Sequence, residues 1–210
     1  MEEFFARTAL VICVAAGAYL SGCVNGAIVT SQVFYHTDIR KHGSGNAGLT
    51  NFYRTFGGRH ALLVIAIDML KAVAAIGIGS AVFSRYLGDA VVGKFFSAWM
   101  CVLGHIFPAF YGFKGGKGIM CSGTLLLLLD WRIALVGWGL FALLWGTTRY
   151  VSLGSVTAAV SLPITAALVF RGKPLAIVLA LCISLTVLWA HRENIVRLVR
   201  GEERRFEWHK

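Results

Sequence analysis

Seven hydrophobic runs, separated by short polar segments, dominate the pattern of this chain. They cover about residues 6–31, 60–83, 94–107, 119–130, 132–147, 153–170 and 174–190. Several are shorter than the ~20 residues that an upright helix needs to cross a bilayer. We therefore expect a set of membrane helices, some of them short, broken or partly re-entrant where protein or a polar cavity covers the backbone.

Composition supports this interpretation, because the chain carries too little charge to cover a soluble surface. Of its 210 residues, 57% are hydrophobic and 14% are charged, and the mean hydropathy is +0.71. Soluble domains are usually about one quarter charged. We predict an all-α integral membrane protein with about seven transmembrane helices, folded as a single domain over residues 1–210.

The distribution of basic residues predicts how the chain is oriented. The net charge is +10, and basic residues collect on the cytoplasmic side of membrane proteins. An odd number of crossings puts the termini on opposite sides, and the C-terminal side then holds the larger share of the 20 Lys and Arg residues. We expect an external N-terminus and a cytoplasmic C-terminus.

Three polar segments interrupt the hydrophobic runs, and all of them fall on the predicted cytoplasmic side. They are residues 41–51, 112–118 and 191–194. Each lies just beyond a hydrophobic run. Together they predict one anion-binding site assembled at one face of a bilayer.

The first segment interleaves glycines with hydrogen-bond donors. Glycine lets backbone N–H groups approach an anion and reach positive φ, and hydroxyl and amide side chains add donors. If a helix starts here, Thr50 or Asn51 caps it and its N-terminus attracts a negative ligand, with Arg54 nearby. A solvated turn with an ordinary N-cap explains the pattern equally well. The segment contains Gly43, Ser44, Gly45, Asn46, Gly48, Thr50 and Asn51.

The second segment places two lysines and three glycines at the start of a hydrophobic run, namely Lys114, Gly115, Gly116, Lys117 and Gly118. Such a helix start can cradle a phosphate. It is not a Walker A motif, because no Ser or Thr follows Lys117, so nucleotide hydrolysis is not supported. The alternative is a basic cytoplasmic turn, which explains the lysines better than the glycines.

The third segment holds His191, Glu193 and Asn194 just past the last hydrophobic run. Glu193 is placed to orient the histidine or to pair with a loop arginine. The alternative is a polar helix end at the membrane surface. For the basic residues beyond Arg192 we expect an amphipathic tail held to anionic lipid.

The remaining ionisable residues favour structural explanations. Asp68 and Lys71 lie three residues apart within the second run, where charges are costly unless paired, so we predict a structural ion pair. His105, alone in an apolar run, is typical of a hydrogen-bonded structural histidine. The five cysteines show no CxxC spacing and mostly lie in apolar runs. We expect buried thiols and a mechanism without metal or other cofactor.

Taken together and in order, these motifs resemble those of the bacterial acyl-phosphate-dependent glycerol-3-phosphate acyltransferase family, called PlsY. The resemblance spans nearly the whole chain, and the set is specific where each piece alone is weak. It is carried by Tyr19-Leu20, Asn25-Gly26, Ser44-Gly45-Asn46-x-Gly48-x-Thr50-Asn51-x-x-Arg54, Asp68-x-x-Lys71, Gly104-His105-x-Phe107-Pro108, Phe113-Lys114-Gly115-Gly116-Lys117-Gly118, Arg149-Tyr150-x-Ser152-Leu153-x-Ser155 and His191-Arg192-Glu193-Asn194-Ile195.

The resemblance implies acyl transfer from acyl phosphate to the 1-hydroxyl of glycerol 3-phosphate, in the bacterial inner membrane and on its cytoplasmic face. It implies functional coupling to the enzyme that makes acyl phosphate, and a structural role for Glu193. The implied catalytic residues are Ser44, Arg54, Lys117, His191 and Asn194. The implied substrate-binding residues are Gly45, Asn46, Thr50, Asn51, Gly115, Gly116, Gly118 and either Ser152 or Ser155.

The sequence departs from the family pattern at two places, and three other functions have to be compared with the one that the resemblance implies. Cys23 stands where the family usually has serine, and Ile119-Met120-Cys121 stands where Val-Ala-Thr is usual. An acyltransferase of the H-x4-D class is rejected, because no aspartate lies five positions after a suitable histidine. An anion transporter and a non-catalytic relative that binds anionic headgroups are the remaining rivals.

Overall fold

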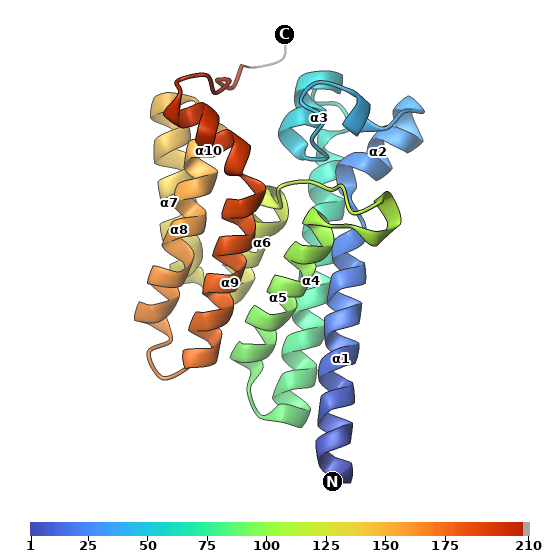
Figure 1. Cartoon of the computed structure of the whole chain (residues 1–210), viewed down its shortest axis with the longest axis vertical. Coiled ribbons are helices and arrows are strands. Elements are labelled where there is room, and N and C mark those ends of the chain that lie inside the picture. Colours follow the sequence, from blue (N-terminus) through green and yellow to red (C-terminus); the bar gives the residue numbers. More distant parts are fainter. Residues whose placement is uncertain (208–210) are drawn as a thin grey trace.

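The structure is a computed structural model that describes residues 1–207, apart from the side chains of residues 119–121. The described chain is a bundle of helices joined by short loops (Figure 1). Its longer helices are α1 (Glu2–Cys23), α4 (Ala61–Val82), α5 (Ala90–Ile106), α7 (Trp131–Thr148), α8 (Val151–Val169) and α9 (Pro174–Ala190). Its shorter helices are α2 (Gly26–Tyr35), α3 (Leu49–Phe56), α6 (Ile119–Leu129) and α10 (Arg192–Val199).

Each predicted hydrophobic run corresponds to one of these helices, except that the first run forms two. The helical structure is interrupted between α1 and α2. There the Asn25 side chain accepts a hydrogen bond from the Ile28 amide at 3.0 Å and so caps α2. The second break follows α5, where Pro108 prevents the helix from continuing. The all-helical integral membrane fold predicted from the sequence is confirmed.

Four stretches of the described chain are long and apolar enough to cross a membrane, or five if the bent pair α9–α10 counts as one span. The four are Glu2–Tyr35, Ala61–Leu87, Ala90–Tyr111 and Val151–Val169. Helix α6 has 11 residues, which corresponds to about 16 Å, roughly half of the hydrocarbon thickness. Seven crossings and the orientation of the termini therefore stay predictions. The start of α1 and the end of the described chain lie at opposite ends of the bundle (Figure 1).

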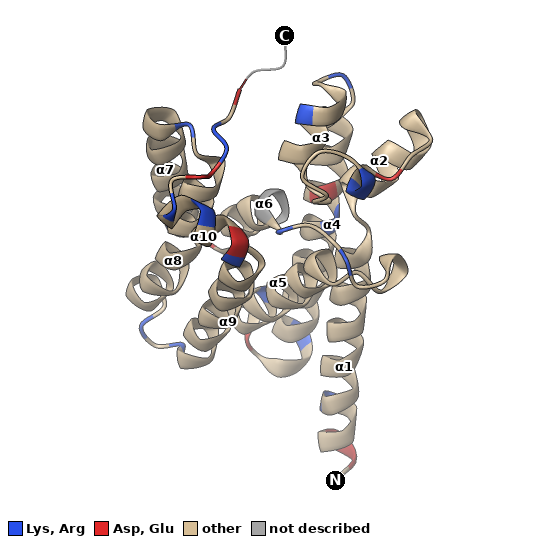
Figure 2. Ribbon diagram, turned by 45° about the horizontal axis from the view of Figure 1, so that its top comes forward, with Lys and Arg blue, Asp and Glu red and all other residues tan. Residues whose placement is uncertain are grey.

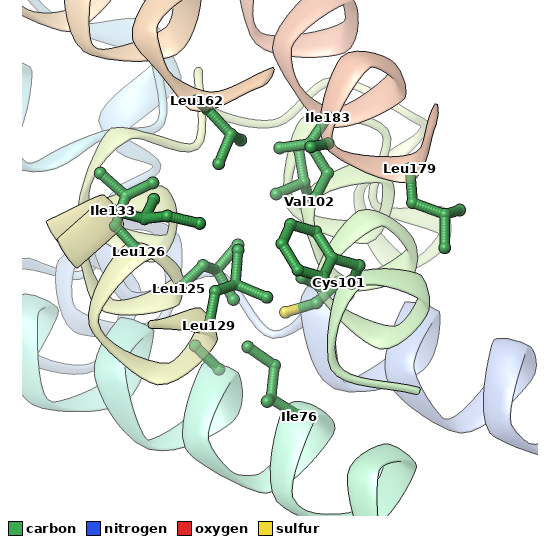
Figure 3. Close-up of a cluster of buried hydrophobic side chains, with 14 of the residues drawn as sticks. Ile76, Cys101, Val102, Leu125, Leu126, Leu129, Ile133, Leu162, Leu179 and Ile183 are labelled. Carbon is green, nitrogen blue, oxygen red and sulfur yellow. The ribbon is translucent and has the colours of Figure 1, made fainter. Parts of the chain in front are cut away.

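Helix α5 is the central packing element of the bundle. It packs against α1 and α4 on one side and against α9 on the other, while α6 packs between α4 and α7. The largest hydrophobic cluster lies between these helices and includes Phe95, Leu125 and Ile183 (Figure 3). Close approach of α1 and α5 depends on glycine, since a Cβ at Gly22 or Gly104 would overlap the backbone of the other helix.

A buried group of charges closes the break between α1 and α2, and we call Asp68, Lys71 and His105 the interior cluster. Lys71 Nζ lies 2.8 Å from Asp68 Oδ1 and 2.7 Å from His105 Nδ1, and it donates to the Val24 carbonyl at 2.7 Å. Asp68 Oδ1 also accepts from the Gly26 amide at 3.1 Å. The ion pair expected between Asp68 and Lys71 is present, and it stabilises the carbonyl and amide groups left free at the helix break.

The three polar segments lie toward the end of the bundle that holds the C-terminus. Figure 2 shows basic residues on α3, on the connecting loops and on α10 around this end. A second, smaller hydrophobic cluster of Ile28, Ile39, Phe52 and Val64 fixes α2, α3 and α4 there. Two separate hydrophobic cores therefore hold the helices that carry the polar segments.

Candidate active site

Asn51 shapes the first polar segment from inside α3. Its side-chain oxygen accepts a hydrogen bond from the Ser44 amide at 2.9 Å, and its amide group donates to the carbonyls of His42 and Asn46 at 3.0 Å. A residue used in this way holds the loop and has little bonding capacity left for a ligand. We therefore interpret Asn51 as a positioning residue, in place of the substrate-binding role expected for it.

The start of α3 differs from its prediction. The helix begins at Leu49 with Gly48 as its N-cap, so Thr50 and Asn51 lie in the first turn and neither caps it. The reason is that Asn51 is engaged by the loop. Ser44 is exposed, and Gly45 adopts a positive φ of 72°, a conformation that glycine tolerates best.

Arg54 lies on α3 and reaches toward the C-terminal tail. Its Nη2 donates to the Arg205 carbonyl at 3.2 Å. Burial, together with the nearby Arg204 charge, lowers the pKa of Arg54. Arg54 nevertheless remains a permanent cation at physiological pH, and it adds positive charge where the first segment meets the tail.

The second segment folds back onto the end of α5. The Gly115 and Gly116 amides donate to the carbonyls of Ile106 and His105, both at 3.1 Å. A Cβ at Gly116 would overlap His105 Nε2 and come within 2.5 Å of the Ala47 carbonyl. These two glycines are required for close approach, and their amides are already used. The binding of phosphate by these glycines stays a prediction, and in this structure their amide groups are bonded to α5.

The same fold-back orients the residues that follow. Gly118 has a φ of 81° and forms the N-cap of α6, so the helix begins directly after the second polar segment. Lys117, just before it, is half-buried, and its Nζ donates to Asn194 Oδ1 on α10. The second and third segments therefore meet, as their shared face predicts.

Four residues form a polar group here that we call the mouth cluster: Lys117, Asn194, Arg197 and Glu203. Asn194 Nδ2 donates to Glu203 Oε1 at 2.8 Å, and Arg197 Nε donates to Glu203 Oε2 at 2.9 Å. Burial, followed by the charge of Arg197, lowers the pKa of Lys117. Burial acts to raise the pKa of Glu203, but the hydrogen bonds from Arg197 and Asn194 outweigh it and the pKa is lowered.

His191 lies at the junction of α9 and α10, and its side chain is buried. Its Nδ1 lies 2.8 Å from the Val187 carbonyl, which accepts a hydrogen bond and so fixes the proton on Nδ1. In the neutral ring, Nε2 then carries a free lone pair that can accept a proton. This tautomer suits a base or a hydrogen-bond acceptor.

Of the two contacts predicted for Glu193, with His191 or with an arginine, the described residues show the contact with an arginine. Its side chain is exposed, and its ion pair is a long one, 3.8 Å to Arg192 of the same helix. The carboxylate that organises Asn194 comes instead from Glu203, in the tail beyond α10. Consecutive residues of a helix do not face each other. Glu193 and Asn194 therefore point to different sides of α10.

The structure separates the two candidate serines. Ser155 donates to the Val151 carbonyl of its own helix at 2.8 Å. Ser152 Oγ is buried beside the Glu203 carboxylate, but without hydrogen-bond geometry, and it has no partner among the described residues. Buried hydroxyls are usually bonded, so Ser152 is the serine with capacity for a ligand.

A partly open apolar groove runs between α6, α7, α8 and α9. Leu126, Trp138, Phe141 and Leu162 are among its lining residues. Three other lining residues lie one helical turn from predicted site residues: Ser122 from Gly118, Ser155 from Ser152 and Val187 from His191. The groove therefore starts directly beneath the polar site.

Not every predicted residue joins this site. Lys117 and Asn194 are in direct contact, and Arg54 is linked to them through the tail. Ser44 and Thr50 make no described side-chain contact with that group. No group of three or more His, Cys, Asp or Glu residues capable of holding a metal occurs among the described residues. The side chains of Ile119, Met120 and Cys121 lie outside the described part.

Two members of the mouth cluster were missed by the sequence analysis. The tail arginines were assigned to anionic lipid, but Arg197 pairs with Glu203 and Arg205 donates to the Tyr150 hydroxyl at 3.5 Å. The available signal was the presence of acids, such as Glu203, and of the aromatic Phe206 among the arginines of the tail. An acid and an aromatic residue there indicate contact with the protein itself.

Comparison with known proteins identifies the family to which this site belongs. Residues 12–201 match the family model described as glycerol-3-phosphate acyltransferase. The chain belongs to the glycerol-3-phosphate acyltransferase family. It is 39% identical over 192 residues to a glycerol-3-phosphate acyltransferase of Syntrophotalea carbinolica, across 90% of this chain and 94% of that relative. It is 37% identical over 186 residues to glycerol-3-phosphate acyltransferase 2 of Bacillus anthracis, across 89% and 94%.

Solved structures of the family agree with the fold. The crystal structure of PlsY (YgiH), an integral membrane glycerol 3-phosphate acyltransferase, in its glycerol 3-phosphate form has a TM-score of 0.80 and 32% identity to this chain. It covers 94% of this chain and 96% of that one. The lysophosphatidic acid form of PlsY has the same TM-score at 30% identity. The PlsY resemblance is thus confirmed at the level of family and fold.

Proposed function

We propose that this protein transfers a fatty acyl group from acyl phosphate to the 1-hydroxyl of sn-glycerol 3-phosphate. The products are lysophosphatidic acid and inorganic phosphate. This reaction would be the first committed step of phospholipid synthesis. One observation carries the proposal: an apolar groove begins one helical turn from a cationic, partly unsatisfied polar site. An amphiphilic substrate with a fatty chain and a phosphate head fits that arrangement, and the family supports the reaction class.

The charges of the site suit two phosphorylated substrates. Lys117 and Arg54 supply cations, and Asn194 supplies an amide group that faces Lys117. Hydrogen bonds between charged donors and phosphate oxygens are short and strong, and they gain strength where water is excluded. We assign the phosphate groups to this end and the acyl chain to the groove.

Further contacts to the substrates are assigned to residues at the rim of the site. In the first segment these are Ser44, Gly45, Asn46 and Thr50, and in the second the Gly118 amide. Ser152 contributes its unpartnered hydroxyl. Each would place a donor near a phosphate oxygen without adding charge.

The chemistry needs no protein nucleophile. The glycerol oxygen attacks the acyl carbonyl carbon, a new ester C–O bond forms, and the C–O bond to phosphate breaks with the electron pair leaving on the phosphate. Because phosphate is a good leaving group, positioning and charge stabilisation carry the step. The hydroxyl proton goes either to His191 Nε2 or to a phosphate oxygen of glycerol 3-phosphate.

The proposed location is the bacterial inner membrane, with the site open to the cytoplasm. Glycerol 3-phosphate is soluble and reaches the site from water, whereas acyl phosphate and the product have fatty chains. We also propose functional coupling to the enzyme that makes acyl phosphate, as the family resemblance implies. Lys41 and Arg171 are exposed, and they belong to the α2–α3 and α8–α9 connections, which lie at opposite ends of the bundle (Figure 1). Single cysteines placed there and labelled from one side of intact cells would test the orientation.

The decisive experiment measures phosphate release by detergent-purified protein. Palmitoyl phosphate is supplied with and without glycerol 3-phosphate, and palmitoyl-CoA replaces it in a parallel arm. Release that requires glycerol 3-phosphate and yields lysophosphatidic acid is the expected result. Turnover with palmitoyl-CoA but not with palmitoyl phosphate would overturn the donor assignment.

Arg54 provides the test of the site itself. We expect Arg54→Ala to lose acyl transfer by about 100-fold, the cost of removing a group that stabilises developing charge. Arg59→Ala is the matched control, since Arg59 is exposed and its side chain has no described partner. Full activity in Arg54→Ala would refute the assignment. Folded protein without turnover would instead favour an anion transporter or a binding-only relative.

A further inference from the structure

The C-terminal tail turns back over the site after α10, and we call residues 202–207 the strap. The turn is made at Gly201, which has a φ of 72°. The Glu202 amide donates to the Arg197 carbonyl at 2.8 Å and the Gly201 amide to the Leu198 carbonyl at 3.2 Å, which is the Schellman pattern of helix termination. The family match ends at residue 201, so the strap lies beyond the part of the chain that the family model covers.

The far end of the strap is anchored by Phe206 on the other side of the site. The Phe206 ring stacks on Tyr53 of α3 at 5.8 Å and meets Trp145 of α7 edge-on at 5.7 Å. Its amide donates to the Arg149 carbonyl at 2.7 Å. The strap therefore spans from α10 to α3 and α7, and it connects the helices that carry parts of the third and the first polar segments, which Figure 1 shows apart at the same end of the bundle.

Between its two attachment points, the strap engages the residues proposed to bind phosphate. The Glu203 carboxylate accepts hydrogen bonds from Asn194 and Arg197, and its charge acts on Lys117, His191 and Arg54. The strap backbone accepts from the Arg54 guanidinium at Arg205. An anionic group of this chain thus lies among cations and donors that suit an anionic substrate.

We propose that Glu203 occupies, in the substrate-free protein, the position that a substrate phosphate takes, so that the strap must be displaced for phosphate to bind. The inference rests on the proposed function and adds an internal competitor to it. A phosphate dianion and the Glu203 carboxylate cannot share these cations without strong repulsion. Because the carboxylate is tethered, it competes at a high effective concentration, whatever the amount of protein.

Displacement of the strap would also release Arg197. In the docked state, its Nε is paired with Glu203 at 2.9 Å. Once the carboxylate has left, the guanidinium is free to bind phosphate oxygens in a bidentate manner. Arg197 then becomes an additional phosphate-binding residue, one that the docked strap hides.

The test compares Glu203→Gln with Glu202→Gln in the full-length, detergent-purified protein. The glutamine side chain keeps the size of the glutamate and one hydrogen-bond acceptor but carries no charge. Glu202 is exposed, and its carboxylate has no described partner, so the control removes the same charge one residue away. Affinity for inorganic phosphate is measured by calorimetry, and the KM for glycerol 3-phosphate is measured in the acyl transfer assay.

The expected result is tighter binding in Glu203→Gln alone. If the strap is docked about nine-tenths of the time, removing the competitor lowers both the phosphate Kd and the KM by about tenfold. Glu202→Gln leaves both unchanged. Weaker phosphate binding and a higher KM in Glu203→Gln would overturn the proposal, because they would show that the carboxylate orders the site for the substrate. Unchanged values would overturn it as well.

A second variant removes the anchor in place of the competing charge. Phe206→Ala loses both ring contacts, and we expect it to lower the KM in the same direction as Glu203→Gln. In the unaltered protein, hydrogen exchange of the Phe206 amide should accelerate when glycerol 3-phosphate is added. Exchange that slows or stays constant while glycerol 3-phosphate binds contradicts displacement of the strap.

The outcomes separate the two proposals. Turnover that requires glycerol 3-phosphate, with the same KM in all variants, refutes the strap and leaves the acyltransferase intact. Absence of turnover in every variant, including the unaltered protein, refutes the proposed reaction. The phosphate Kd still decides whether Glu203 competes for the anion site in that case, since this measurement needs no turnover.

Discussion

The interior cluster and the mouth cluster have similar chemistry and opposite designs. Each combines a lysine and a carboxylate with further polar side chains inside an apolar bundle. In the interior cluster, Asp68 and Lys71 come from one helix and are almost fully buried, with 1% and 4% of their side chains exposed. In the mouth cluster, the lysine and the carboxylate come from distant segments, and Arg197 retains 39% exposure of its side chain.

The contrast indicates how to tell a structural charge from one that serves a ligand. Lys71 and Asp68 use their bonding capacity on each other and on backbone groups at the α1–α2 break. Beside the mouth cluster, the Ser152 hydroxyl has no described partner, and a terminal segment supplies the counter-charge. Buried polar groups that depend on a displaceable segment are candidates for ligand binding.

Breaking the interior cluster should have the largest effect. Asp68→Ala leaves the buried Lys71 ammonium without its counter-ion, and loss of one partner of a buried pair typically costs about 3–5 kcal/mol. We expect a large drop in the thermal unfolding temperature of purified protein, with activity lost in parallel. Asp89→Ala is the control, because Asp89 pairs with Lys173 at the surface and its side chain is 32% exposed. Equal effects from the two substitutions would contradict the comparison.

Breaking the mouth cluster should reduce activity and leave stability nearly intact. We expect Lys117→Ala to lower kcat/KM for glycerol 3-phosphate by about 100-fold, since it removes a cation from the developing charge. Lys114→Ala serves as the control, because the Lys114 side chain is exposed and has no described partner. A Lys117→Ala protein that unfolds at a much lower temperature would place this lysine with the structural charges.

Gly116 lies against His105 of the interior cluster and directly precedes Lys117 of the mouth cluster, so a methyl group there should disturb both. Its Cβ would overlap His105 of the interior cluster and press on the first polar segment at Ala47. We expect Gly116→Ala to cost about 1–3 kcal/mol of stability, as overpacking does, and to reduce acyl transfer. Gly139→Ala in α7 meets no atom within 4 Å and should leave both properties unharmed. Unaltered stability and turnover in Gly116→Ala would show that the second segment is not held as described.

The smallest expected effect is a shift in pH dependence that sharpens the comparison. Burial lowers the pKa of Lys117 from the ordinary 10.5, so this lysine loses its charge at a lower pH than an exposed lysine. The KM for glycerol 3-phosphate should therefore rise with pH before ordinary lysines titrate. In Lys117→Arg the rise should move to higher pH, because arginine stays protonated. The same pH profile in both proteins would show that another group controls the rise.

Periodicity and motif spacing predicted the helices well, because the apolar runs are long and their ends carry strong signals such as Pro108. The juxtaposition of Lys117 and Asn194 also followed from the shared face of the polar segments. The roles of Gly115, Gly116 and Asn51 did not, since sequence does not reveal that their bonding groups are used by backbone nearby. Glu203 was missed because a turn at Gly201, rather than any local pattern, carries it to the site.

The interior cluster also has a consequence for the order in which the chain is assembled in the membrane. Its groups come from the α1–α2 break, from α4 and from α5, which are synthesised one after another. Lys71 can pair with Asp68 as soon as α4 forms, but its contact with His105 has to wait for α5 to leave the insertion machinery. A charged helix that lacks these partners is costly to release into lipid. We therefore expect the early helices to stay near the insertion machinery until the third long helix arrives.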